Sequence, residues 1–208
     1  MNQQAKLAIW IILFVLIVVG FCLWIFYRPF WRWYTRRNPQ KAYYHSIRTL
    51  ADLRDYYLIN EFKVEVDEKN SIRIDHILAG DKYIYLLFDR YFSGAMDANP
   101  LDDYWLYHRA DGTKERIVNP IHEAEAMMSF FSMQTHVSSD LLVGIVLIND
   151  DCFFTPFKNE GKTPILVPIS KLKKVISSYE GRDIQSLSRN ELYRVIQNLA
   201  VWKERGHV

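Results

Sequence analysis

The sequence predicts an α/β fold class: one N-terminal transmembrane helix, followed by a domain with a mixed central sheet flanked by helices. Three observations predict it. An uncharged apolar run lies near the start of the chain, the segments after it follow the order helix, strand, strand, strand, helix, strand, and residues 83–88 are apolar throughout. A strand without polar alternation is typical of the centre of a sheet that is covered on both faces.

Residues 7–27, from Leu7 to Tyr27, contain no charged side chain. A helix of 21 residues is about 31 Å long, which is enough to cross a hydrocarbon core of about 30 Å. The alternative is a cleaved signal peptide. We discount it because the run is longer than a signal h-region, only Lys6 precedes it as a charged residue, and no small-x-small cleavage site follows.

Basic and aromatic side chains follow the apolar run and suit the lipid headgroup region. The residues predicted to contact lipid headgroups are Arg28, Trp31, Arg32, Trp33, Arg36 and Arg37. Because positive charge is retained on the cytoplasmic side, we predict a short N-terminus, residues 1–6, outside the cell. Residues 28–41 are then a juxtamembrane linker in the cytoplasm, and the chain is a single-pass protein of the cell membrane.

Charge is distributed unevenly along the chain. Residues 1–41 hold six of the 26 Lys and Arg residues and no acid, so residues 42–208 hold 20 basic and all 24 acidic residues, a net charge of −4. Such a domain is a poor general binder of nucleic acid, because non-specific affinity comes mainly from basic side chains on phosphates. Cys22 in the apolar run and the isolated Cys152 indicate no disulfide framework.

The elements after the anchor are predicted from local patterns. Asn38-Pro39 separates the anchor from a helix, and Phe62, Val64 and Val66 alternate with charged residues as in a half-buried strand. In chain order, we predict a helix at 40–54, strands at 56–66, 72–79 and 83–88, a long loop at 91–103, a hairpin of strands at 104–109 and 114–118, a helix from 119–120, a strand at 141–148, a loop at 149–164, a short strand at 165–167, and helices at 170–178 and 188–202.

Three short motifs place the later elements. Asp111-Gly112 is a hairpin turn signal. Asn119-Pro120 puts an asparagine at a helix cap and a proline in the first helical position. Ser188 with Glu191 is a capping box that starts the last helix.

Ile74-Asp75-His76 comes before a buried strand that leads to Ser93-Gly94, and Trp105 and Asn119-Pro120 follow. This arrangement resembles the nuclease-related domain (NERD) family, which is placed in the PD-(D/E)XK nuclease superfamily. The resemblance covers residues 42–150 and implies a restriction-endonuclease-like domain. Residues 151–208 are then an extension of the same domain, with no functional motif of their own.

The resemblance also implies a site: an acid on one strand, then Glu-x-Lys at the end of the next. The carboxylates of such a site bind Mg²⁺, and the metal activates water. Here Asp75 matches the acid, but the glutamate position falls on Phe88 and the lysine position on Arg90. Arginine keeps its proton and cannot act as a base. Asp89 is adjacent, but neighbouring residues of a strand point to opposite faces.

Three functions remain open. We favour a domain that has lost hydrolysis and acts as a binding or scaffold module. The first alternative is a Mg²⁺-dependent nuclease with a rearranged site, in which Asp75 and Glu123 bind the metal and Arg90 assists catalysis; a metal cofactor is expected only in that case. The second is a membrane-associated protein-interaction module. The predicted partners are membrane lipid and either nucleic acid or another protein, with no small-molecule cofactor.

Other polar residues are given simpler interpretations. His76 is in phase with the apolar positions of its strand, which predicts a hydrogen-bonded, partly buried histidine. Asp97, Asp102 and Asp103 lack the spacing of a calcium loop. The remaining histidines considered, which lack a close ligand pair for zinc, are His108, His122 and His136.

Overall fold

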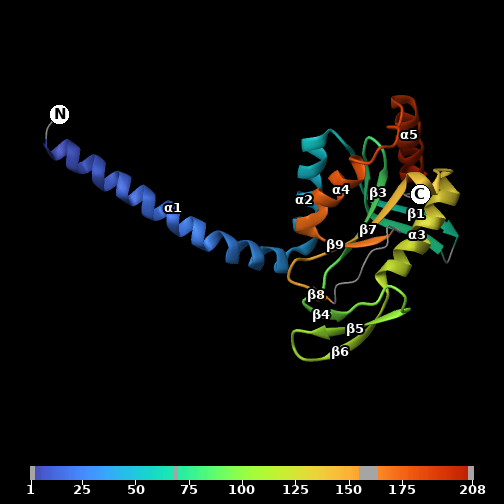
Figure 1. The fold of residues 1–208 in the computed structure, drawn as a ribbon, viewed down its shortest axis with the longest axis horizontal. Coiled ribbons are helices and arrows are strands. Elements are labelled where there is room, and N and C mark those ends of the chain that lie inside the picture. The colour runs from blue at the N-terminus through green and yellow to red at the C-terminus, as the bar shows by residue number, and fades with distance from the viewer. Residues whose placement is uncertain (1–2, 68–69, 155–163, 206–208) are drawn as a thin grey trace. The chain divides into compact units, whose positions relative to one another are not determined.

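The computed structural model of this chain describes residues 3–67, 70–154 and 164–205 (Figure 1). The chain forms two compact units, Met1–Ala42 and Tyr43–Val208. Parts of three predicted segments lie outside the described residues: the start of 1–6, the middle of the turn after the first strand, and most of the loop at 149–164.

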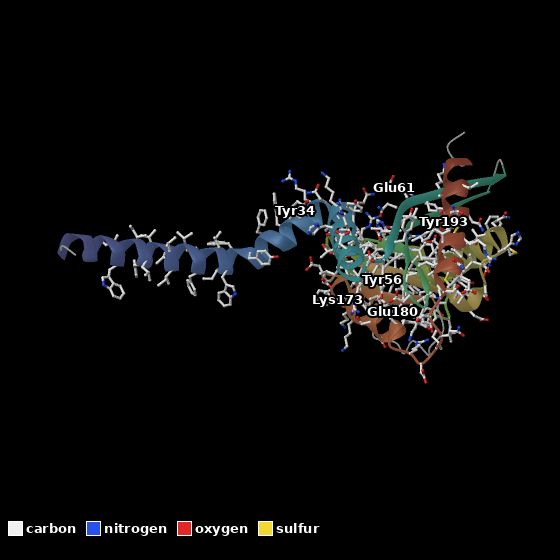
Figure 2. All side chains as sticks on the ribbon, turned by 90° about the horizontal axis from the view of Figure 1, so that it is seen from above. Tyr34, Tyr56, Glu61, Lys173, Glu180 and Tyr193 are labelled. Carbon is white, nitrogen blue, oxygen red and sulfur yellow. The ribbon has the colours of Figure 1, made fainter. Side chains whose placement is uncertain are left out.

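The first unit is built around helix α1 (Gln3–Arg37). Its window Trp10–Tyr27 has a mean hydropathy of 2.7 with no residue buried, so the helix is long and apolar enough to cross a membrane. Its apolar side chains project outward along its length (Figure 2). Four of the predicted headgroup contacts have side chains that lie outside the described part of the structure: Arg28, Trp31, Arg32 and Arg36.

The stretch predicted as a juxtamembrane linker, residues 28–41, is helical over most of its length. Helix α1 continues past Tyr27 to Arg37 with Pro29 inside it, and only Asn38 separates it from α2 (Pro39–Arg54). The stretch contains no glycine, and its first proline removes one backbone donor without supplying a turn residue. In the described part of this segment, the Arg37 guanidinium lies 5.4 Å from the centre of the Trp33 ring.

The second unit contains the predicted mixed central sheet. Its strand order is β1-β2-β3-β7-β9. The pairs β1–β2 and β2–β3 are antiparallel, whereas β3–β7 and β7–β9 are parallel. The strands are β1 (Tyr57–Asp67), β2 (Asn70–Ala79), β3 (Ile84–Arg90), β7 (Leu142–Ile148) and β9 (Ile165–Pro168). The mixed sheet of the sequence prediction is therefore confirmed.

Helices cover both faces of this sheet (Figure 1). Helices α2 and α4 (Leu172–Glu180) pack on one face, against Tyr85, Leu87 and Ile145. Helices α3 (Pro120–Thr135) and α5 (Arg189–Arg205) contribute to the core on the other face, together with Leu86 and Phe88. Strand β7 and residues 84–88 of β3 carry apolar or aromatic side chains throughout, which fits a position buried on both faces.

A second sheet was not predicted. Its order is β6-β5-β4-β8, and it contains the expected hairpin. The predicted loop at 91–103 is wrong for four of its residues, which form β4. Gly94 allows β5 to approach closely enough to pair with this segment, because a Cβ at position 94 would collide with the backbone oxygen of His108 on β5. The bounds are β4 (Gly94–Asp97), β5 (Tyr104–Arg109), β6 (Lys114–Val118) and β8 (Phe153–Phe154).

The two predicted helix starts are confirmed in detail. The Asn119 side chain accepts a hydrogen bond from the backbone of Ile121 at 2.9 Å and donates to the carbonyl of Asp102 at 2.8 Å. Ser188 and Glu191 form the reciprocal bonds of a capping box. Short 3-10 turns, η1 (Ser139–Leu141) and η2 (Ile169–Lys171), precede β7 and α4.

Candidate functional site

The predicted site residues Asp75, Arg90 and Glu123 come together at the end of β3. They are supplied by β2, β3 and α3 respectively. Arg90 Nη2 donates to Glu123 Oε2 at 3.0 Å, and Arg90 Nη1 lies 3.9 Å from Asp75 Oδ2. The guanidinium therefore lies between the two carboxylates that the nuclease alternative assigns to a metal.

Asp75 occupies an interruption in the strand ladders. The β1–β2 register pairs Asn60 with His76 and Phe62 with Ile74, so Glu61 and Asp75 are skipped, and Glu61 has a left-handed φ of 53°. Asp75 Oδ2 accepts a hydrogen bond from the backbone N–H of Asp89 at 2.8 Å. The carboxylate thus satisfies a backbone donor where the β2–β3 ladder has ended, which is a structural use of this side chain.

Phe88, at the position where the family pattern has glutamate, is a core residue. Its exposed fraction is 2%, and it packs in the cluster that includes Ala124 and Met128 of α3. A phenyl ring cannot bind a metal. The two nearby acids, Asp75 and Glu123, both face the Arg90 guanidinium, which stays positively charged. Among the described residues, no group of three or more His, Cys, Asp or Glu side chains could hold a metal. This arrangement does not fit a divalent cation.

A second polar cluster lies on the opposite face of the sheet and was not predicted as a unit. His76 is only 6% exposed. Its Nδ1 lies 2.7 Å from Asn60 Oδ1, and its Nε2 lies 3.1 Å from Asp89 Oδ2. The expectation of a hydrogen-bonded histidine is confirmed. Period-two spacing could have found the cluster, since Asp89 follows the buried Leu87 by two positions.

Asp89 is the most unusual carboxylate of this region. Burial raises its pKa; the His76 hydrogen bond and charge oppose this, and Asp75 adds to it. Its second oxygen, Oδ1, is buried and has no hydrogen-bond partner among the described residues. Asn60 Oδ1 faces one ring nitrogen of His76 and Asp89 Oδ2 faces the other, so both ring nitrogens have a polar partner.

The remaining acidic candidates lie apart from this region. Asp97 pairs with His108 at 3.2 Å, and Asp103 lies 3.6 Å from His122, so these acids do not converge as calcium ligands would. The backbone carbonyl of Asp102 accepts a hydrogen bond from the Asn119 side chain. His136 is the left-handed C-cap of α3 and has no ligand role in the described part of the chain.

Fold and site together define an α/β domain with a polar cluster on each face of its central sheet, in a chain that also carries a helix long enough to cross a membrane. In comparisons with known proteins, no family model, curated protein or solved structure matches this chain.

Proposed function

We propose that this protein is a single-pass membrane protein whose cytoplasmic domain resembles the NERD family, has lost metal-dependent hydrolysis, and acts as a binding or scaffold module. The observation that carries the proposal is the Arg90 guanidinium between Asp75 and Glu123. A fixed positive charge in this place neutralises the carboxylates that a nuclease would give to Mg²⁺, and arginine cannot take a proton from water.

The buried Phe88 independently supports the proposed loss of metal-dependent hydrolysis. A metal-binding carboxylate would have to replace a ring that is packed against α3. The net charge of −4 on residues 42–208 further favours a protein partner over nucleic acid for this domain.

A nuclease assay on the full chain in detergent micelles tests the loss of hydrolysis. In Mg²⁺ or Mn²⁺, we expect the wild-type chain to cleave single- and double-stranded DNA and RNA no more than the Asp75→Ala variant does. Asp97→Ala, which removes an exposed acid on β4, is the matched control. Metal-dependent cleavage that Asp75→Ala abolishes and Asp97→Ala retains would establish the nuclease alternative instead.

The membrane anchor is the second part of the proposal. Helix α1 supports it by its length, and the basic residues that follow residue 27 support an orientation with the N-terminus outside. After expression in cells, we expect the chain to keep its first 27 residues and to remain in the membrane pellet after alkaline carbonate extraction. We also expect added protease to digest the domain only after the membrane is permeabilised, because the domain then becomes accessible from the cytoplasmic side.

A signal sequence predicts different results. The mature chain would then lack the apolar segment, as mass spectrometry of its N-terminus would reveal, and carbonate would release it. Leu16→Arg, which puts a charge at the centre of α1, is expected to weaken membrane retention, because a cation at mid-bilayer costs about 2.5–3.5 kcal/mol on insertion scales.

A further inference from the structure

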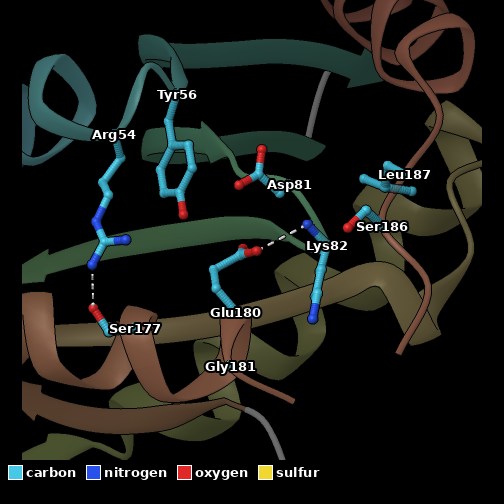
Figure 3. Close-up of a pocket in the computed structure, with 9 residues that line it drawn as sticks. All are labelled: Arg54, Tyr56, Asp81, Lys82, Ser177, Glu180, Gly181, Ser186 and Leu187. Carbon is cyan, nitrogen blue, oxygen red and sulfur yellow. Dashed lines mark hydrogen bonds between the residues drawn. The ribbon is translucent and has the colours of Figure 1, made fainter. Parts of the chain in front are cut away.

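A pocket of about 390 Å³ lies at the turn between β2 and β3, at the opposite end of β3 from Arg90 (Figure 3). This volume is within the range of about 300–1,000 Å³ that small-molecule sites occupy. Its walls come from the end of α2, from this turn, from the end of α4, and from the segment before α5. The polar clusters described above are not part of it.

The backbone at the end of α2 is shaped so that two side chains reach this pocket. Asp55 has a left-handed φ of 55°, and the Tyr56 N–H donates to the carbonyl of Ala51 at 3.0 Å, which closes the helix as in a Schellman motif. Arg54 and Tyr56, on either side of Asp55, both line the pocket. A non-glycine residue in this conformation costs about 1–2 kcal/mol, so the geometry is held by its surroundings.

The opposite wall is rigid. Glu180 Oε2 accepts a hydrogen bond from the backbone N–H of Lys82 at 3.0 Å, and Glu180 Oε1 accepts one from the Tyr85 hydroxyl at 2.7 Å. A Cβ on Gly80 would collide with the same carboxylate, so the turn lies directly against it. The acidic wall is therefore preorganised, which lowers the entropy that a ligand must lose on binding.

Two groups in the pocket retain unused hydrogen-bonding capacity. Among the described residues, neither the Asp81 carboxylate nor the Tyr56 hydroxyl has a hydrogen-bond partner. Figure 3 shows Tyr56 between Arg54 and Asp81, with its hydroxyl directed toward Glu180. Burial, then Glu180 and Asp81, raise the pKa of Tyr56 to about 12, so it keeps its proton at neutral pH. Arg54 donates from Nη2 to Ser177 Oγ at 3.0 Å and has further donors for a ligand.

The charges of the pocket indicate the class of ligand. The lining contains two cations, Arg54 and Lys82, and two acids, Asp81 and Glu180. A ligand with a single charge would pair with either the cations or the acids of the pocket and leave the others without a partner. A ligand that carries both a positive and a negative charge can pair with both. Lys82 Nζ donates to the carbonyl of Arg182, so Arg54 is the cation with donors left for a ligand.

We propose that this pocket binds a small zwitterion of the free α-amino acid type. Its carboxylate accepts hydrogen bonds from the Arg54 guanidinium and the Tyr56 hydroxyl, and its ammonium group donates to Asp81 and Glu180. The site is separate from the Asp75 region, so the proposal stands or falls independently of the function proposed above.

Titration calorimetry on the full chain in detergent micelles tests this, with the twenty free amino acids as single probes. We expect at least one to bind with a Kd of about 1 mM or tighter. Acetate and ethylammonium, which each carry one of the two charges, are expected to bind at least about tenfold more weakly. Arg54→Met and Asp81→Asn should each weaken binding at least about tenfold.

Arg48→Met is the matched control, because it makes the same change on an exposed position of α2 outside the pocket. It should leave the affinity unchanged, and circular dichroism should show the same helix content in all three variants. Three results would each overturn the proposal: no amino acid binds, a single charged group binds as well as the zwitterion, or binding survives either pocket substitution.

Discussion

Replacing Phe88 with glutamate is expected to lower the free energy of unfolding of the domain by about 3–5 kcal/mol. This substitution introduces an acid at the position where the NERD family, which the sequence resembles, has glutamate. The side chain is only 2% exposed and packs in the core between the sheet and α3. The variant therefore loses the packing of a phenyl ring and also buries a carboxylate among apolar neighbours, of which Ala124 and Met128 are two.

Urea unfolding of the full chain in micelles, followed by circular dichroism, measures this effect. Phe88→Leu is the control for packing alone and should cost at most about 1.5 kcal/mol, because it nearly conserves apolar volume. If Phe88→Glu were as stable as the wild type and bound Mg²⁺, position 88 would be able to serve as a metal site, and the loss of hydrolysis would have to be reconsidered.

Replacing His76 with leucine is expected to cost about 3 kcal/mol at neutral pH, because it removes one partner of a buried pair. The carboxylate of Asp89 is 14% exposed, and its Oδ1 already has no hydrogen-bond partner among the described residues. Without His76, its Oδ2 loses the contact at 3.1 Å as well. The double variant His76→Leu/Asp89→Leu should recover much of this loss, since no buried charge then remains.

The cost of His76→Leu should depend on pH, and the sign follows from Asp89. Burial raises the folded-state pKa of this acid above its ordinary value of 3.8, so the folded protein holds the proton more tightly than the unfolded chain does. Its contribution to stability is complete below the ordinary pKa and is lost as pH rises through the folded pKa. The hydrogen bond and charge of His76 lower this pKa, so His76→Leu leaves the pKa of Asp89 higher still. The variant therefore loses more stability than the wild type as pH rises, and we expect a smaller loss at about pH 4 than at about pH 7.

Urea unfolding at both pH values measures this dependence. A loss that is equal at the two values, or a double variant as unstable as His76→Leu, would show that the destabilisation comes from the histidine ring and not from the unpaired carboxylate.

Local patterns in the sequence were sufficient wherever a contact joins near neighbours. Asn119-Pro120 and Ser188 with Glu191 start helices because a cap needs only residues within one turn. The alternation in β1 and the apolar run of β3 likewise predicted strands, since a strand's two faces are set by period two. Strand β4 was missed because Gly94, Ala95 and Met96 carry no alternation, and only the approach of β5 makes them a strand.

Local patterns predict the apolar helix, the helix caps and the order of most strands, and they place Phe88 and Arg90 where the NERD family, which the sequence resembles, has glutamate and lysine. Long-range packing sets the second sheet, the position of Arg90 between Asp75 and Glu123, and the pocket where Arg54 meets Ser177. Each of these features joins residues that are far apart in the sequence. Arg54 and Ser177 are 123 residues apart, and local sequence patterns do not predict which distant side chains come into contact.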